Sequence, residues 1–248
     1  DLINADSDEW LQRLEEKWKN GSALAGLSTG IKLLDNATMG LEDGAVYLVG
    51  GRPGSGKSCL MQNLALQTAS NRNLPTGFIS LEYARGPMRE RFLSTATSIP
   101  LPRIKTGRLS SEQLELVKEM NLRLNAVPLA LSDRSLDLAG VKNLARRWKR
   151  KYGIRVLFLD YLQLIRPGRA MSIYEAVSEA SREVKALAMD LQVPIVAGVQ
   201  LNRDMERRNR EPCLADLRDS GQLEQDATSV WLLDHAYADA KRKKLIEN

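Results

Sequence analysis

Eight consecutive residues carry the clearest chemical signal in the chain. Gly51 to Ser58 read Gly-Arg-Pro-Gly-Ser-Gly-Lys-Ser and match the pattern GxxxxGK followed by Ser or Thr. The apolar run Val46 to Val49 precedes the pattern and a helical pattern follows it, which is the context that a phosphate-binding loop requires. The glycines let backbone N–H groups turn inward on phosphate oxygens, and the positive end of the next helix adds to that field. We therefore predict that phosphates are bound by Gly51, Arg52, Pro53, Gly54, Ser55, Gly56, Lys57, Ser58 and Cys59.

Two side chains of this loop have the chemistry to act on a bound nucleotide. Lys57 is expected to reach the β and γ phosphates. The Ser58 hydroxyl is expected to bind Mg²⁺, which takes few protein ligands and keeps several waters. A phosphate cradle alone does not hydrolyse anything, so a metal-binding carboxylate and a group that orients water must come from elsewhere in the chain.

Three polar residues outside the loop each follow a short apolar run. Glu82 follows Phe78 to Leu81, Asp160 follows Val156 to Leu159, and Gln200 follows Pro194 to Val199. The carboxyl ends of parallel strands form one edge of an open sheet, where ligands bind. We assign Asp160 to Mg²⁺ through water, Glu82 to polarising the attacking water and Gln200 to sensing the γ phosphate. The alternative for each is a polar residue that only ends its strand.

From Gly44 onward, short apolar runs alternate with longer helical patterns. The predicted strands are Ala45 to Val49, Phe78 to Leu81, Val127 to Leu131, Val156 to Leu159, Pro194 to Val199 and Val230 to Leu233. The predicted helices are Lys57 to Ala69, Pro87 to Thr97, Glu112 to Asn125, Leu138 to Lys151 and Tyr174 to Leu191. Ser110 and Gln113 fit a capping box at the start of the third. The sequence predicts an α/β fold with a mainly parallel sheet covered by helices on both faces.

The first residues predict a separate amphipathic helix. Ser7 to Asn20 carries Trp10, Leu11, Leu14 and Trp18 at helical spacing, and the stretch after it, through Gly30, is rich in Gly and Ser, as flexible connectors are. We predict a linker helix with its connector over residues 1–26 and one larger domain over 27–248. The two tryptophans are expected to dock either on this chain's own body or on a neighbouring subunit or a missing domain.

Composition excludes several classes of protein. The 248 residues are 43% hydrophobic and 27% charged, with 36 Lys and Arg against 31 Asp and Glu and a net charge of +5, which permits a nucleic-acid partner without requiring one. No apolar run is long enough for a membrane span, so no membrane partner is expected. Two cysteines, Cys59 and Cys213, indicate a reducing, cytoplasmic compartment. The single histidine, His235, excludes a histidine metal cluster or catalytic triad within this chain.

In the order and the residues of its motifs, nearly the whole chain resembles the C-terminal motor domain of hexameric replicative DNA helicases of the DnaB type, which have a RecA-like P-loop NTPase core. The residues that carry this resemblance are Gly26 to Gly30, Arg52 to Ser58, Ser80 to Glu82, Lys105 to Gly107, Asp160 to Leu164, Gln200 to Arg203, Asp216 to Gly221 and Glu224 to Asp226.

The resemblance implies an ATP- and Mg²⁺-dependent motor that translocates on single-stranded DNA as a ring of six and unwinds duplex DNA. It also implies that the N-terminal helix packs on the adjacent subunit, and that a primase and a helicase loader are partners. The loop matching Arg218, Asp219, Ser220 and Gly221 is expected to contact the DNA backbone. For Arg218 and Asp219 the alternative is a solvated ion pair, and for the whole protein it is a nucleotide-switched DNA-binding or assembly protein without processive unwinding.

Two departures from the family pattern stand out. The N-terminal collar domain of such helicases is not in this sequence, which fits either a fragment or a reduced phage or plasmid relative. After Leu233 the sequence lacks the stretch that carries a basic finger in the family, so no arginine finger is assigned. Separately, seven basic residues between Val141 and Arg155 form either a nucleic-acid patch or, as their amphipathic spacing favours, the solvated outer face of a helix.

Overall fold

The computed structural model describes residues 7–19, 21, 24–166, 172–202, 211–217 and 221–234. By its internal packing the chain divides into two units, residues 1–42 and 43–248. This division lies later in the chain than the predicted boundary after residue 26, which stays a prediction. Within the described residues, no helix is both long and apolar enough to cross a membrane.

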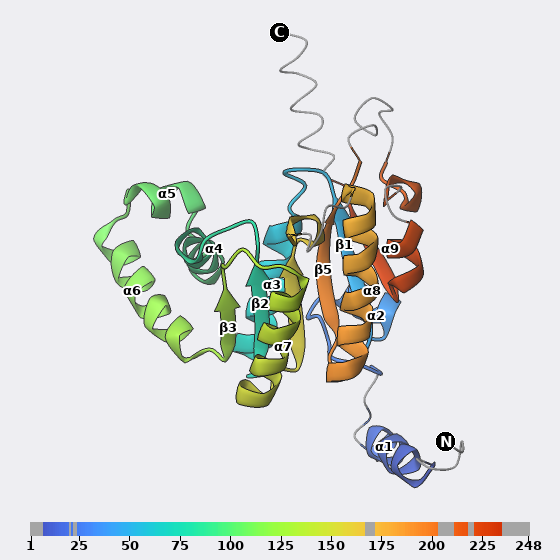
Figure 1. Cartoon of the computed structure of the whole chain (residues 1–248). Coiled ribbons are helices and arrows are strands. Elements are labelled where there is room, and N and C mark those ends of the chain that lie inside the picture. The colour runs from blue at the N-terminus through green and yellow to red at the C-terminus, as the bar shows by residue number, and fades with distance from the viewer. Residues whose placement is uncertain are drawn as a thin grey trace. The chain divides into compact units, whose positions relative to one another are not determined.

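The larger unit is built on a six-stranded sheet in the order β3-β2-β4-β5-β1-β6, with every strand pair parallel (Figure 1). The strands are β1 Val46–Gly51, β2 Thr76–Ser80, β3 Leu129–Ser132, β4 Val156–Asp160, β5 Ile195–Gln200 and β6 Ser229–Leu233. All six predicted strands are confirmed. β1, β2 and β4 are buried along their whole length, because helices cover the sheet on both sides.

The helices that cover the sheet are α3 Lys57–Asn71, α4 Arg85–Thr97, α6 Ser111–Ala126, α7 Leu138–Tyr152 and α8 Ile173–Leu191. In Figure 1, α7 and α8 lie in front of the sheet and α3 lies behind it. The core on the α7 and α8 side includes Trp148, Val184 and Leu157. The predicted capping box is present, since Ser110 and Gln113 each bond the other's backbone at the start of α6.

Three short helices were not predicted from the sequence. They are α2 Lys32–Thr38, α5 Leu101–Thr106 and α9 Gly221–Asp226, and none is long enough to show a helical period in its apolar residues. Two 3₁₀ turns, η1 Leu162–Leu164 and η3 Leu214–Leu217, complete the elements that the structure describes.

The smaller unit begins with α1 Ser7–Lys19, on which Trp10 is 62% exposed and Trp18 is 81% exposed. Farther along, Leu27 and Leu41 exchange two backbone hydrogen bonds of 2.7 and 2.8 Å. The buried carboxylate of Asp35 accepts hydrogen bonds from the Ser28 hydroxyl and from the backbone N–H and hydroxyl of Thr29.

This carboxylate gives the segment before α2 a fixed conformation. Burial raises the pKa of Asp35, but the hydrogen bonds from Ser28 and Thr29 outweigh that effect, so the pKa lies below its ordinary value. The prediction of a flexible connector through Gly30 is therefore wrong for Ser28 and Thr29. Both residues are buried, and they hydrogen-bond the carboxylate of Asp35.

Candidate functional site

The predicted phosphate-binding loop joins the end of β1 to the start of α3. Gly54 and Gly56 have φ angles of +77° and +97°, which favour glycine. A Cβ added at Gly51 would lie 2.2 Å from the Ser55 hydroxyl and 3.0 Å from the Lys57 side chain. The backbone geometry therefore favours glycine at positions 54 and 56, and at Gly51 the nearby Ser55 and Lys57 side chains leave little room for a Cβ.

Lys57 is the first residue of α3 and its side chain is buried, with 8% exposed. Its Nζ donates a hydrogen bond of 3.2 Å to the Gly51 carbonyl and lies 5.5 Å from the ring centre of Tyr161. Burial lowers the pKa of Lys57, while the negative charges of Asp160 and Glu82 act against that shift. The ammonium group thus lies at the loop beside two carboxylates.

Asp160 ends β4 and its side chain is fully buried. Neither carboxylate oxygen has a partner among the described residues that meets ordinary hydrogen-bond geometry, although the Ser58 hydroxyl lies near enough to act on the pKa of the carboxyl group. The pKa of Asp160 is raised to about 6, mainly by burial and further by the Glu82 charge, although the Ser58 hydroxyl, the Lys57 ammonium and the Arg91 guanidinium act against this shift. A buried carboxylate with open oxygens beside a serine hydroxyl has the oxygen donors that Mg²⁺ prefers.

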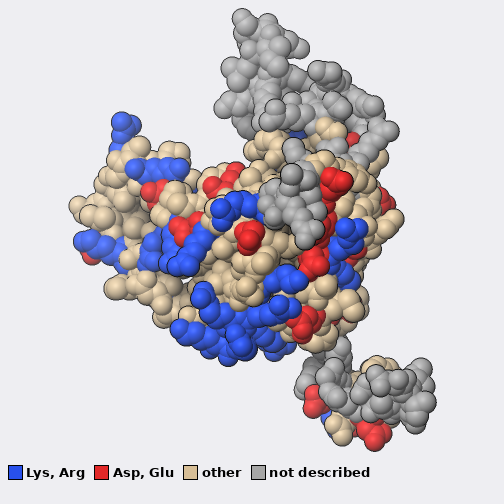
Figure 2. All heavy atoms as spheres, in the orientation of Figure 1, with Lys and Arg blue, Asp and Glu red and all other residues tan. Residues whose placement is uncertain are grey.

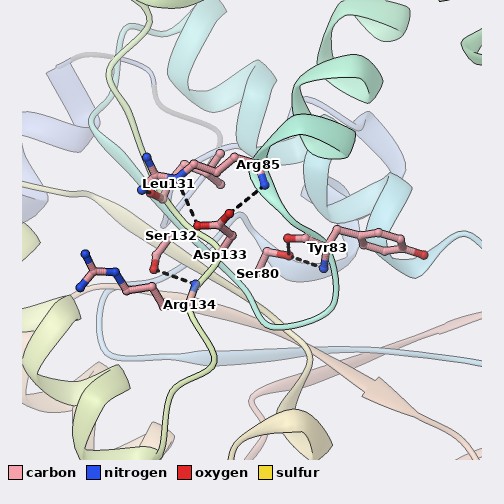
Figure 3. A network of polar contacts seen from close by, with 7 residues as sticks. All are labelled: Ser80, Tyr83, Arg85, Leu131, Ser132, Asp133 and Arg134. Carbon is pink, nitrogen blue, oxygen red and sulfur yellow. Dashed lines mark hydrogen bonds and ion pairs between the residues drawn. The ribbon is translucent and has the colours of Figure 1, made fainter. Parts of the chain in front are cut away.

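Glu82 lies in the turn between β2 and α4, and its Oε2 accepts a hydrogen bond of 3.4 Å from the Ser58 hydroxyl. Ser80 shapes this turn, because its hydroxyl donates to the Tyr83 carbonyl at 2.7 Å and accepts from the Tyr83 N–H at 2.9 Å (Figure 3). The side chain of Glu82 is exposed, so it faces the solvent side of the loop.

The start of α4 is tied to the end of β3 by Arg85, as Figure 3 shows. The Arg85 N–H donates to Asp133 at 3.0 Å, and its guanidinium donates to the Leu131 carbonyl at 2.8 Å. The turn that carries Glu82 is thus held at both ends, by Ser80 on one side and by Arg85 on the other.

Gln200 ends β5 directly beside Gly51, its partner in the parallel register. Its backbone N–H and carbonyl both bond to the side chain of Gln163. The structure therefore brings Lys57, Ser58, Glu82 and Asp160 into one group, which we call the phosphate-loop cluster, and places Gln200 at the same edge of the sheet. The last predicted phosphate-binding residue, Cys59, is an exposed free thiol on α3.

Comparison with known proteins identifies the family. Residues 26–247 match the family described as DnaB-like helicase C terminal domain. The chain belongs to this family. A solved structure described as "ATPase Domain of G40P" has a TM-score of 0.89 and 29% identity, covering 97% of this chain and 87% of that one. The DnaB-like family thus accounts for the fold, and the predicted RecA-like α/β core is confirmed.

Relatives of the DnaB-like domain include whole helicases. A replicative DNA helicase DnaB of Leifsonia xyli subsp. xyli (strain CTCB07) is 40% identical over 220 residues, which are 88% of this chain and 48% of the relative. Another, of Rickettsia typhi (strain ATCC VR-144 / Wilmington), is 34% identical over 238 residues, which are 91% of this chain and 48% of the relative. The chain spans about half the length of these curated relatives.

A second solved structure is described as "The Structure Of A DnaB-Like Replicative Helicase And Its Interactions With Primase". It has a TM-score of 0.84 and 30% identity, and the match covers 94% of this chain and 57% of that one.

Sequence reasoning missed Arg91 on α4, which lies close to the phosphate-loop cluster of this DnaB-like domain. Its guanidinium carbon is 4.4 Å from the ring centre of Tyr83, and its charge lowers the pKa values of Tyr83 and Asp160. Its Nε is buried without a hydrogen-bond partner among the described residues. In the sequence, Arg91 is an ordinary residue of a predicted helix, and no local pattern predicts that it lies near Tyr83 and Asp160.

The predicted DNA-contact residues lie mostly outside the described part of the DnaB-like domain. Arg218, Asp219 and Ser220 are outside the described residues, and Gly221 is the first residue of α9. These predictions therefore stay predictions.

The basic residues of α7 form its outer face, as the amphipathic spacing predicted. Figure 2 shows Lys and Arg gathered over this helix, while Val141 and Trp148 are buried beneath it. Lys142 pairs with Glu183, and Arg146 pairs with Asp190 at 2.9 Å. We call this surface the α7 basic face, and it comprises Lys142, Arg146, Arg147, Lys149, Arg150 and Lys151.

Proposed function

We propose that this chain is the motor of an ATP-dependent replicative DNA helicase that translocates on single-stranded DNA and unwinds duplex DNA as a ring. One observation carries the proposal: the buried Asp160 carboxylate has no partner of ordinary hydrogen-bond geometry among the described residues and lies beside Lys57, Ser58 and Glu82. Such a carboxylate is costly for folding, so it favours a bound cation at this place, beside the loop proposed to hold phosphates. Membership of the DnaB-like family supports the DNA-unwinding part.

The residues present fit ATP and Mg²⁺. Ser58 and Asp160 would hold the metal, which neutralises charge on the β and γ phosphates when bound. Lys57 is placed to exchange the Gly51 carbonyl for phosphate oxygens. In this proposal Glu82, which is exposed and bonded to Ser58 Oγ, orients and polarises the attacking water, and Gln200, which ends β5 beside Gly51, senses the γ phosphate.

The proposed partners follow from the family and from exposed surfaces of the described residues. We propose a ring of six in which α1 packs on the adjacent subunit, because Trp10 and Trp18 are largely exposed on an amphipathic helix. Single-stranded DNA would contact Arg218 to Gly221. A primase is a proposed partner since one solved relative is described with primase, and a helicase loader is proposed from the family resemblance.

We also propose a cytoplasmic location. Cys59 and Cys213 are both exposed free thiols, and exposed thiols persist in reducing compartments. Oxidation of Cys59 would alter a residue directly next to Ser58, which makes a reducing compartment suitable for the loop.

The test measures ATP turnover, with and without single-stranded DNA, and displacement of an annealed strand by the assembled protein. We expect Glu82→Gln to lower turnover by roughly 10²- to 10⁴-fold while ATP binding is retained. The matched control is Glu119→Gln, which removes a carboxylate from an exposed ion pair on α6 and should leave turnover unchanged.

Two results would count against the proposal in different ways. Unchanged turnover in Glu82→Gln would refute the catalytic assignment of Glu82. Normal ATP binding with turnover that is indifferent to single-stranded DNA, and no strand displacement, would favour the nucleotide-switched DNA-binding or assembly protein instead.

A further inference from the structure

Gln163 uses both ends of its side-chain amide on the backbone of one distant residue. It lies in η1, three residues after Asp160. Its Nε2 donates a hydrogen bond of 3.2 Å to the Gln200 carbonyl, and its Oε1 accepts one of 3.2 Å from the Gln200 N–H. This is the pattern by which a neighbouring strand would bond Gln200, supplied here by a side chain.

The sheet explains why a side chain is needed at this place. The pairing of β4 with β5 ends at Leu159 and Ala197, so β4 provides no partner for the last residues of β5. On the opposite side β1 continues, and Gly51 pairs with Gln200. Gln163 therefore extends the ladder on the β4 side, and Gln200 is held between Gly51 and Gln163.

The same contacts reach the phosphate loop. The Gly51 carbonyl accepts hydrogen bonds from two donors, Lys57 Nζ at 3.2 Å and the Leu201 N–H at 3.3 Å. A continuous series of hydrogen bonds thus runs from Lys57 through Gly51 to the end of β5, and from there to Gln163. If Lys57 binds phosphate instead, the Gly51 carbonyl loses one donor and keeps the Leu201 donor, which would link the end of β5 to the state of the phosphate loop.

We propose that Gln163 is a positioning residue that couples the DNA-binding segment to ATP turnover. This rests on the proposed function, because the chain that leaves β5 after Gln200 leads to the proposed DNA contacts at Arg218 to Gly221. Gln163 lies three residues after Asp160, and it bonds Gln200, from which the chain continues towards the proposed DNA contacts. If DNA binding displaces the end of β5, Gln163 transmits this displacement to η1, which follows the proposed metal-binding residue Asp160.

The test compares ATP turnover with and without single-stranded DNA in Gln163→Leu, which removes both hydrogen bonds with little change in size. We expect the ratio of DNA-stimulated to basal turnover to fall about tenfold, the size expected from two hydrogen bonds of ordinary strength. The KM for ATP should stay within about twofold, because Gln163 bonds Gln200 and donates to no residue of the phosphate loop itself. The control is Gln67→Leu, an exposed glutamine on α3, which should keep the wild-type ratio.

A second variant and a second readout guard against misfolding. Gln163→Glu keeps the acceptor for the Gln200 N–H and loses the donor, so its ratio should fall as well. Hydrogen exchange of the peptide 195–202 should be faster in Gln163→Leu, because the Gln200 N–H loses its acceptor there.

The outcomes separate this proposal from the proposed function. Faster exchange together with a wild-type stimulation ratio would overturn the coupling role of Gln163 alone. A wild-type protein whose turnover is not stimulated by DNA at all would overturn both proposals, and a reduced ratio at unchanged KM would support both.

Discussion

The phosphate-loop cluster and the α7 basic face are both rich in charge, but they differ in burial and in pairing. Asp160 is fully buried, its oxygens have no partner of ordinary hydrogen-bond geometry among the described residues, and its pKa is raised to about 6. On α7, Lys142 and Arg146 each have an acidic partner on α8, and the side chain of Arg146 is 45% exposed.

This difference shows which charges indicate a ligand. Solvent and partners satisfy the charges of α7, so they cost little and need no further explanation. The Asp160 carboxylate is held at a free-energy cost that folding alone does not require, which is what we expect of a group that binds a cation. The number of charges in a region is therefore less informative than their burial and pairing.

The largest effect is expected when a lysine of the phosphate-loop cluster is replaced, and a lysine of the α7 basic face serves as the comparison. Lys57→Ala should lower ATP turnover by ~10³-fold or more and weaken nucleotide binding, because it removes the ammonium placed at the phosphates. Lys149→Ala, on the α7 basic face, should leave both unchanged. Steady-state turnover and titration with a fluorescent ATP analogue measure these effects, and equal losses in the two variants would remove the distinction.

The next effect concerns the stability of the metal-free protein. The pKa of Asp160 is about 6 when folded against an ordinary value of 3.8, so the folded state binds the extra proton between these pH values. The contribution of Asp160 to stability therefore falls as pH rises from about 4 to about 6 and then levels off.

Asp160→Asn removes this cost and should stabilise the metal-free protein by about 3 kcal/mol at pH 7 and by almost nothing at pH 4. ATP turnover should be lost in the same variant. Urea unfolding in a chelator at several pH values measures the stability. A variant that is destabilised at pH 7 would mean that the buried carboxylate is well compensated.

A smaller effect is expected from filling the space beside Asp160. A Cβ at Gly198 would lie 3.2 Å from Asp160 Oδ1 and 3.0 Å from the Tyr161 Cβ. Gly198→Ala should therefore destabilise the protein by about 1 kcal/mol and lower turnover. The control is Gly86→Ala on α4, where a Cβ meets nothing within 4 Å, and thermal unfolding should show it to be neutral or slightly stabilising.

The smallest effect belongs to the α7 basic face. Breaking the exposed pair between Arg146 and Asp190 should cost about 0.5 kcal/mol and leave ATP turnover unchanged. A double-mutant cycle with Arg146→Ala and Asp190→Ala measures the coupling energy. A coupling several times larger, or a loss of turnover, would show that this face is more than a solvated surface.

Much of the fold was predictable because its signals are local. Apolar runs identified the strands, amphipathic spacing identified the long helices, and Ser110 with Gln113 marked the start of α6. Asp160 and Glu82 each follow a buried apolar run. Because the carboxyl ends of parallel strands share one edge of the sheet, this predicted their place at the edge that carries the phosphate loop.

Other features depend on contacts between distant segments, and the sequence carries no signal for them. The bonds from Gln163 to Gln200 exist because β4 stops pairing before β5 ends, which only the register shows. The position of Arg91 over Tyr83 depends on how α4 packs. Ser28 and Thr29 hydrogen-bond Asp35, but their Gly- and Ser-rich sequence is typical of a flexible connector.

The central claim is tested most directly by a crystal structure with Mg²⁺ and a non-hydrolysable ATP analogue. We expect the terminal phosphates to lie against the N–H groups of residues 54–58, with Lys57 Nζ moved from the Gly51 carbonyl to phosphate oxygen. Electron density for the metal should lie beside Ser58, bridged by water to Asp160. A nucleotide bound elsewhere, or carboxylates of Asp160 and Glu82 that face away from the phosphates, would contradict this account.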